Sequence, residues 1–521
     1  MTAKLTPLRS LRFLLFATLL CLECFLLRAP TFLRSVIDWD EGLWMVMADH
    51  WQHDQPLYSS VWDIRPAGIF LIFKGAFLVF GRSVFSIRLM TILFVWATAL
   101  TLYLLGRRLF RDERVGRIAA ILYPALSLGL EGLESTTELF YIPFNLLGLL
   151  FLLQEDRVTP VPSRVSYRNA LFAGLCFGVA LQIKYIVAVE VFFFLLCLLQ
   201  VYRKAGSVRG YVLIVCIAGA GCLVPTFAAG FYFWSQGVFE LFLDTNFFIM
   251  LHYIDSSGTF IYRTGRFLIS LLNWLQWLFA LLVLSVLALF KRDRLKKGSE
   301  EEKYERTFLS LWLLAALVEA WCTTRFYAHS YLVTLPPLCL FAANLISKQN
   351  TVSRYTGLKA MCTVLIGYAV IHCTVDKYAE WVAVFVKQGK DSNERVAEYL
   401  KSSLSPEDYL YVVNGQPVLY FLAGANLPTR YVFPAHLLDP SYNRMAHIDF
   451  ESEVTRILGF QPKFIVFSTE SDSFPDRVAM IQKRIEANYV LDRTVIEANY
   501  VLDRPVDEVT IYRRVPSDGH R

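Results

Sequence analysis

The chain has 521 residues, of which 55% are hydrophobic, 15% aromatic and 18% charged. Soluble proteins average about 25% charged residues, so this composition excludes a fully water-soluble chain. The net charge of +6 does not indicate a nucleic-acid partner. Much of the basic excess lies in short loops between apolar runs, where Lys and Arg set membrane orientation. We therefore expect a membrane protein that does not bind nucleic acid.

The first apolar run, residues 11–30, is expected to be a retained membrane span. No small-residue cleavage site follows it, as a signal peptide would require, and further spans come after it. A perpendicular crossing takes about 20 residues, and the sequence predicts about eleven spans. They lie at 11–30, 84–106, 117–134, 138–154, 169–184, 187–201, 210–234, 267–290, 307–321, 331–346 and 357–376.

The loops between these runs differ in charge. The N-terminus and every second loop after it together carry more than twice as many Lys and Arg residues as the other loops. Basic loops stay on the cytoplasmic side. The N-terminus is therefore expected in the cytoplasm, and the loop at residues 31–83 and the C-terminal tail are expected on the outer side.

The outer loop begins with an acidic cluster, Asp38, Asp40 and Glu41, directly beside membrane-embedded chain. Charges are costly to desolvate there, so we interpret them as a functional-site hypothesis. Residues 42–53 follow with an apolar helical stripe. Residues 67–81 are apolar, but a helix of that length reaches only about 22 Å, too short to span. Both segments are expected to be amphipathic helices at the outer interface.

The sequence pattern of the C-terminal tail differs from that of the preceding spans. It alternates β-rich runs at 408–414, 462–469 and 508–514 with helical patterns at 393–404 and 476–489, which is typical of an α/β domain. We expect a mainly α, polytopic transmembrane domain over residues 1–376 and a periplasmic α/β domain over residues 377–521.

The order of motifs resembles a known superfamily. An outward pair, Asp40 and Glu41, follows the first span, and a basic-Pro-x-Gly turn stands at 65–68 before Arg88 opens the second span. The chain is similar to the GT-C lipid-linked glycosyltransferases. Within them it most resembles the bacterial protein O-mannosyltransferase and aminoarabinose-transferase-like branch, including the Rgt-type galacturonosyltransferases. Further matches are STTELF at 135–140, Lys184-Tyr185 and RFYAHSYLVTLPPL at 325–338.

This resemblance implies an inverting transfer of a sugar from a polyprenyl-phosphate donor to an acceptor hydroxyl of a glycan, lipid or protein. The reaction would take place at the periplasmic face of the bacterial inner membrane. It needs a base for the acceptor proton and positive charge for the departing phosphate. Asp40 matches the family's catalytic carboxylate and is expected to be the base, with Glu41 as its partner. The alternative is that both carboxylates only solvate a loop.

Arg65, Arg88 and Lys184 are the outward basic residues expected to bind the phosphate. Snorkelling to lipid headgroups is the alternative for each. The family's usual Lys-Pro-Pro turn is here Arg65-Pro66-Ala67-Gly68, which keeps the charge and loses one ring.

Three further residues are candidate substrate contacts. Glu138 matches a family acidic position and would bind acceptor or a basic residue, or else favour a helix N-terminus. Tyr327 would face the sugar, and His329 would face the sugar or a metal, although a lone interfacial His is more often an ordinary hydrogen-bonding residue. Asp38-Trp39-Asp40 also has the D-x-D spacing that binds a divalent cation in other GT-C enzymes. Catalysis in this branch is usually metal-independent, so no metal or other cofactor is expected.

Two other classes of function remain open. A transporter or flippase of lipid-linked sugars also carries intramembrane charge, but such folds often show inverted repeats and broken mid-membrane helices. No pairing of two halves is visible in this sequence, and its charges lie at one interface. A non-catalytic subunit whose tail binds a partner would not depend on Asp40.

Overall fold

The computed structural model describes most of the chain. The described residues are 7–52, 55–153, 165–204, 206–250, 259–290, 300–323, 325–347, 356–468, 474–485, 489–497 and 506–514. They form two compact units. Unit 1 comprises residues 1–29, 88–229 and 257–377, and unit 2 comprises residues 30–87, 230–256 and 378–521.

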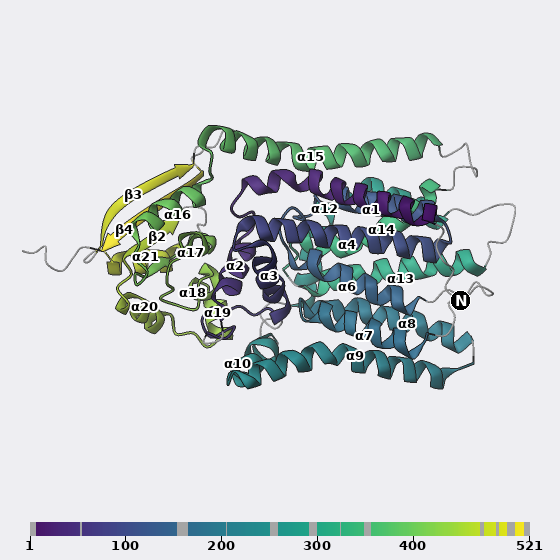
Figure 1. The fold of residues 1–521 in the computed structure, drawn as a ribbon, viewed down its shortest axis with the longest axis horizontal. Coiled ribbons are helices and arrows are strands. Elements are labelled where there is room, and N and C mark those ends of the chain that lie inside the picture. Colours follow the sequence, from purple (N-terminus) through teal and green to yellow (C-terminus); the bar gives the residue numbers. More distant parts are fainter. Residues whose placement is uncertain are drawn as a thin grey trace, which may run out of the picture. The chain divides into compact units, whose positions relative to one another are not determined.

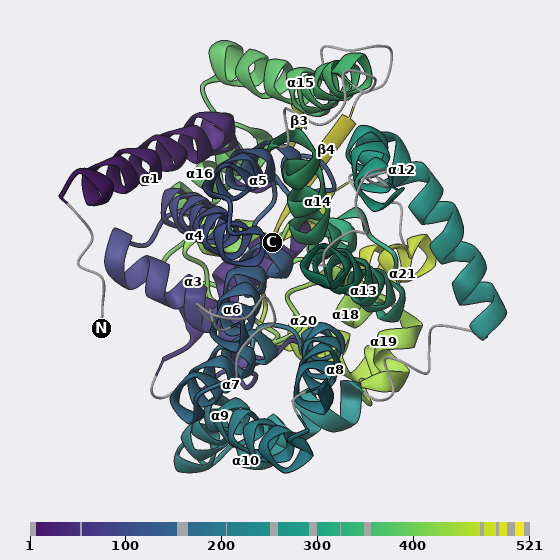
Figure 2. The ribbon, with the colours of Figure 1, turned by 90° about the vertical axis from the view of Figure 1, so that its right-hand side faces the viewer.

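Unit 1 is a helical bundle whose helices mostly run side by side (Figures 1 and 2). Helix α5 packs on α14, α6 on α7, and α8 on α13. Its elements are α1 (Pro7–Arg28), most of α4 (Val84–Phe110), α5 (Glu113–Leu126), α6 (Thr137–Leu152), α7 (Tyr167–Leu181), η2 (Tyr185–Val187), α8 (Ala188–Lys204), most of α9 (Val208–Ser235), α12 (Phe260–Phe290), α13 (Glu300–Cys322), η4 (Ala328–Thr334), α14 (Leu335–Ser347) and the first part of α15 (Thr356–Gln388).

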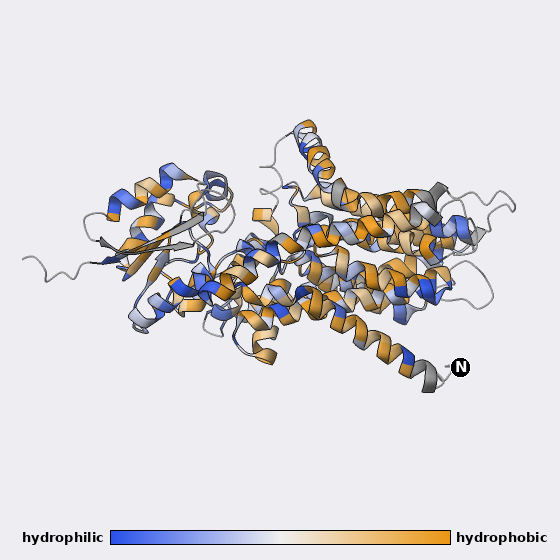
Figure 3. Cartoon of the chain, turned by 90° about the horizontal axis from the view of Figure 1, so that it is seen from above, coloured by the Kyte–Doolittle hydropathy of each residue, from blue (hydrophilic) through white to orange (hydrophobic). Residues whose placement is uncertain are grey.

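Small residues allow the close approach of these helices. A Cβ on Gly148 of α6 would lie 2.4 Å from the Phe177 ring of α7, and one on Gly116 of α5 would lie 2.4 Å from the Tyr103 carbonyl of α4. Lipid tails are as apolar as the helix surfaces, so the hydrophobic effect does not drive helices together in a membrane. Close packing at small residues helps to hold such a bundle together. Figure 3 shows apolar residues along most of the length of these helices.

Six helices of the described residues are long and apolar enough to cross a membrane, or seven if the bent pair within α12 is one span. The expected polytopic helical fold is therefore confirmed, but the count of eleven is not. Several expected spans are short helices here, such as α6 with 16 residues and α7 with 15. Such helices reach only about 24 Å, less than the roughly 30 Å of hydrocarbon.

Unit 2 contains both helices expected in the outer loop, α2 (Trp39–His50) and α3 (Ala67–Phe80), which pack against each other. Helix α3 exposes Leu71, Leu78 and Val79, as expected of an interfacial helix. Helix α2 differs from the sequence expectation, because Glu41 to Ala48 are all buried. The reason is that α17 (Val418–Ala423) of the tail also packs on it.

The tail is the expected α/β structure. Parallel strands β1 (Leu410–Val412) and β2 (Phe464–Ser468) are extended by antiparallel β4 (Val506–Arg514) and β3 (Tyr489–Glu497), in the order β1-β2-β4-β3. All five residues of β2 are buried. The accompanying helices are α16 (Ser392–Ser403), α17, α18 (Pro434–Leu438), α19 (Pro440–Met445), α20 (Phe450–Gly459) and α21 (Pro475–Ile485); unit 2 also holds α10 (Phe239–Leu243) and η3 (Asp244–Phe248).

Candidate active site

The acidic cluster forms the first turn of α2. Asp38 is the N-cap, and its carboxylate accepts a hydrogen bond of 2.9 Å from the Asp40 backbone N–H. Glu41 is buried, and its Oε2 accepts from the backbone N–H of Ile37 at 3.0 Å. Unpaired N–H groups and the helix dipole favour negative charge at this position. Asp38 and Glu41 therefore have local structural roles, and Asp40 is paired with another side chain.

That side chain is Arg65, whose guanidinium donates to Asp40 in an ion pair. Arg65 directly precedes Pro66, the N-cap of α3, so the pair joins the N-terminal ends of two packed helices. The guanidinium also lies 5.1 Å from the centre of the Trp44 ring. Both charged side chains keep about a quarter of their surface exposed, 28% for Asp40 and 24% for Arg65. An accessible carboxylate and an accessible cation thus stand next to each other.

Asp63 lies beside this pair and was not among the expected site residues. It is buried and accepts hydrogen bonds from the Trp44 indole N–H at 3.2 Å and from the Ile64 backbone N–H at 2.7 Å. The Arg65 Nε lies 3.9 Å from its carboxylate. Burial raises the pKa of Asp63 to about 6, against the opposing charge of Arg65. Arg65 is therefore placed between two carboxyl groups, one accessible and one buried.

A tail residue, His436, completes this side of the site. Its Nε2 is 3.8 Å from the Asp63 carboxylate, and its ring packs against Trp62 with 4.8 Å between ring centres. Burial lowers the pKa of His436 to about 3. The imidazole is consequently neutral at physiological pH, and its contact with Asp63 is not an ion pair.

The other expected site residues lie in unit 1. Lys184, just before η2, donates to Glu138 in the first turn of α6 at 2.5 Å. Glu138 is buried and Lys184 keeps 19% of its side-chain surface exposed. Arg88 in α4 is also buried and donates to the Ser135 hydroxyl at 3.3 Å. The structure thus pairs two of the expected residues, Glu138 and Lys184, with each other.

His329 also has a defined partner in unit 1. Its Nδ1 lies 2.9 Å from Glu131, and its backbone N–H donates to the same carboxylate at 3.2 Å. Tyr327 is 57% exposed and stacks on the His329 ring, with 5.5 Å between ring centres. Glu131, Glu134 and His329 have ligand atoms within 4.8 Å of one another, an arrangement able to hold a metal ion. Among the described residues, this cluster is the group of three or more such side chains brought within that distance of one another.

Asp40 and Arg65, both predicted from the sequence, are paired in the structure, whereas Asp63, His436 and Glu131 were not predicted. Asp63 stood two residues before Arg65, so its position beside the basic turn was an available signal. His436 and Glu131 offered none, because each acts on a residue far away in the chain.

Residues 65–233 match the family model described as dolichyl-phosphate-mannose-protein mannosyltransferase. The fold is similar to that of ArnT from Cupriavidus metallidurans bound to undecaprenyl phosphate, with 15% identity, 96% of this chain and 97% of that chain covered, and a TM-score of 0.62. The apo state of ArnT gives 12% identity, 96% and 98% coverage, and a TM-score of 0.58.

A third solved structure, the arabinofuranosyltransferase AftD from Mycobacteria, has 12% identity and a TM-score of 0.50, and covers 96% of this chain but only 40% of that chain. A search of curated protein sequences finds no match. The class that emerges is a multi-pass membrane protein with the fold of ArnT. The family-model match over residues 65–233 and this shared fold agree with the resemblance noted in the sequence.

Proposed function

We propose that the chain transfers a sugar from a polyprenyl-phosphate donor to an acceptor hydroxyl at the periplasmic face of the bacterial inner membrane. The observation that carries this proposal is the Asp40–Arg65 pair at the ends of α2 and α3, accessible on both side chains. ArnT, whose fold this chain shares, was solved with undecaprenyl phosphate bound. Donors of this lipid class supply both an activated sugar and a phosphate leaving group.

In the proposed step the Asp40 carboxylate takes the proton of the acceptor hydroxyl. The acceptor oxygen forms a bond to the anomeric carbon as the bond from that carbon to the phosphate oxygen breaks. The electron pair leaves with the phosphate, and the configuration at the anomeric carbon inverts. Arg65 stabilises the negative charge that develops on the phosphate, and Arg88 and Lys184 are further candidates for phosphate binding.

Arg65 has two parts in this proposal. While it is paired with Asp40 it favours the ionised carboxylate, which is the form that accepts a proton. Asp63 offers Arg65 a second negative partner 3.9 Å away. The cation can therefore turn toward a donor phosphate without leaving the site. Glu41 would act by holding the first turn of α2 in place, through its hydrogen bond from Ile37.

The test is complementation of a deletion strain. Mass spectrometry of its envelope glycolipids and glycoproteins identifies the residue mass that the deletion removes. The wild-type chain should restore that mass and Asp40→Asn should not, although it inserts in the membrane normally. Asp49→Asn is the matched control, because Asp49 lies at the other end of α2 and pairs with Arg82; it should restore the product.

A second measurement separates chemistry from binding. Purified Asp40→Asn chain in nanodiscs should still bind undecaprenyl phosphate in native mass spectrometry. Full product formation by Asp40→Asn would remove Asp40 as the base. Transport of a lipid-linked sugar with no glycosylated product would instead support the flippase alternative.

A further inference from the structure

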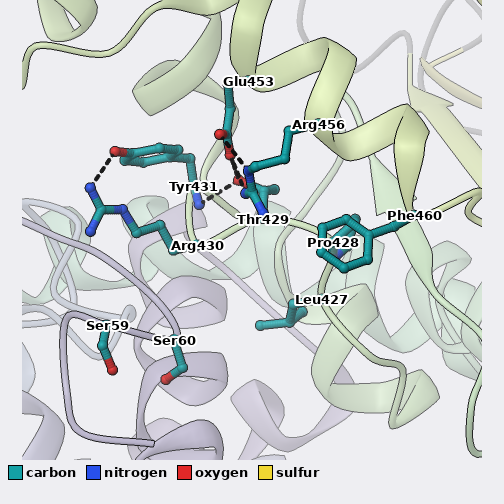
Figure 4. A pocket seen from close by; sticks show the side chains of 10 residues that line it. All are labelled: Ser59, Ser60, Leu427, Pro428, Thr429, Arg430, Tyr431, Glu453, Arg456 and Phe460. Atoms are coloured by element: carbon teal, nitrogen blue, oxygen red, sulfur yellow. Dashed lines mark hydrogen bonds and ion pairs between the residues drawn. The ribbon is translucent and has the colours of Figure 1, made fainter.

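A separate cavity of about 430 Å³ lies within unit 2 (Figure 4). None of the residues proposed for sugar transfer lines it. Its volume is within the roughly 300–1,000 Å³ range of small-molecule sites. The walls come from Ser59 and Ser60 of the first outer loop, from the tail segment around Arg430, and from α20 and the residue that follows it, Phe460.

Two hydrogen bonds and one contact between aromatic rings hold these walls together. The Trp62 backbone N–H donates to the Arg430 carbonyl at 2.9 Å, and the Thr429 hydroxyl donates to Glu453 of α20 at 2.6 Å. The Trp62 ring packs on Tyr431, with 5.8 Å between ring centres. The cavity is therefore built on three segments that are fixed to one another rather than on a single mobile loop.

The cavity has an excess of one positive charge. Glu453 accepts two hydrogen bonds from Arg456, at 2.6 and 2.9 Å. Burial acts to raise the pKa of Glu453, but the hydrogen bonds from Arg456 and Thr429 and the positive charges of Arg456 and Arg430 outweigh it and lower that pKa. The carboxylate thus balances Arg456. Arg430 donates to the Tyr431 hydroxyl at 2.7 Å, and it forms no ion pair within the part of the chain that the structure describes.

The neutral part of the lining suits a polyhydroxylated ligand. The Ser59 hydroxyl already donates to the Pro56 carbonyl at 2.6 Å, which leaves its lone pairs as acceptors for ligand hydroxyl groups. Phe460 is 40% exposed and offers an apolar ring face, as Pro428 and Leu427 offer aliphatic surface. Sugars present this combination of hydroxyl groups around one apolar C–H face.

We propose that this cavity binds an anionic saccharide, a sugar whose carboxylate or phosphate pairs with Arg430 and whose ring packs on Phe460. Arginine binds both kinds of anion through paired N–H groups. The site adds a glycan-binding function to the outer part of the chain. This proposed binding site does not depend on whether Asp40 is the catalytic base, because the cavity shares no residue with the transfer site.

The test is calorimetric titration of the full-length chain in nanodiscs of neutral lipid. The probes are glucuronate, glucose 6-phosphate and glucose. One charge-assisted hydrogen bond is worth about 1.5–3 kcal/mol, so at least one acidic probe should bind about 10-fold or more tightly than glucose. Preference for glucuronate would indicate an acidic polysaccharide as the natural source, and preference for glucose 6-phosphate a phosphorylated glycan.

Three variants assign the binding to this cavity. Arg430→Gln should remove the preference for the acidic probes. Phe460→Ala should lower the affinity for all three probes by the same factor. Arg484→Gln removes the same charge from α21, where Arg484 pairs with Glu451, and should change nothing. Equal binding of glucose and both acidic probes, or an unchanged preference in Arg430→Gln, overturns the inference. If Arg65→Gln abolishes binding of the acidic probes and Arg430→Gln does not, the probes bind at the transfer site. That result also overturns the inference.

Discussion

Asp391 accepts hydrogen bonds from both the backbone N–H and the hydroxyl of Ser35, at 2.7 and 2.8 Å, across a sequence separation of 356 residues. The same carboxylate caps α16 by accepting from the Glu394 backbone N–H at 3.0 Å. One buried side chain therefore ties the segment that precedes α2 to the first helix of the tail.

Asp391→Ala should strongly destabilise unit 2. It removes a helix cap, worth about 1 kcal/mol, and leaves buried donors of Ser35 unpaired, at about 1–3 kcal/mol. We expect faster limited proteolysis around α16 and a loss of roughly 2–4 kcal/mol. Asp449→Ala is the control, since Asp449 caps α20 through Ser452 but is exposed; it should cost only the cap. Equal protease resistance of the two variants would contradict this role of Asp391.

Arg65 should be needed for the rate of sugar transfer. Removing one group that stabilises charge in a transition state typically costs about 10²–10³-fold in kcat, and we expect Arg65→Gln to lose about that much. Arg65→Lys keeps the charge but not the paired N–H groups, so its rate should lie between those of Gln and wild type. Initial rates in membranes check the order. A fully active Arg65→Gln would exclude Arg65 from the reaction.

The buried carboxyl of Asp63 should make stability depend on pH. Its folded-state pKa is raised from 3.8 to about 6, so its contribution to stability is fully present below about pH 4 and is lost as the pH rises through about 6. Asp63→Asn has no such titration. Relative to wild type, the variant should gain stability between pH 4 and 7, by ~3 kcal/mol at most. Thermal unfolding in detergent at several pH values measures this difference.

A carboxylate with the opposite shift provides the control. Burial acts to raise the pKa of Asp408, but Lys463, 2.7 Å away, and the Ser405 backbone N–H lower it. Its contribution is present at higher pH and is lost as the pH falls through its folded pKa. Asp408→Asn should therefore lose stability relative to wild type as the pH rises. The same trend in both variants would show that the pH dependence has another origin.

Replacing each of two glycines in neighbouring helices by alanine should change the stability of the protein in opposite directions. A Cβ on Gly42 in α2 would lie 2.9 Å from the Val418 backbone nitrogen, whereas a Cβ on Gly75 in α3 meets nothing within 4 Å. Gly75→Ala should stabilise by about 0.5–1 kcal/mol through helix propensity. Gly42→Ala should instead cost about 1–3 kcal/mol by overpacking and should lower activity, because α2 carries Asp40. Unfolding midpoints of the two variants decide the sign.

Local patterns were enough to predict much of the fold. Strands were expected at 408–414 and 462–469, and β1 and β2 lie within these ranges. The helices at 42–53 and 67–81 were also found, within three residues of their observed ends. Alternation and helical spacing are properties of neighbouring residues, so they can be identified without knowledge of the tertiary structure.

Contacts between distant segments were not predictable in this way. The apolar stripe on α2 predicted one buried face, but α17 covers the helix from another side. The partners of Asp63 and His329, namely His436 and Glu131, lie hundreds of residues away in the chain. The expected count of eleven spans is not confirmed among the described residues, where some hydrophobic runs continue past the ends of their helices; α5, for example, stops at Leu126.

The tie between Ser35 and Asp391 also bears on the biosynthesis of this protein. A ribosome completes the segment with Asp40 early, whereas Val418, which packs on α2, and His436, which contacts Asp63, are added near the end of translation. A truncated product can insert its early spans and still lack the contacts that position the helix carrying Asp40. Competence for transfer would then arise only once the last fifth of the polypeptide has emerged and folded back onto its beginning.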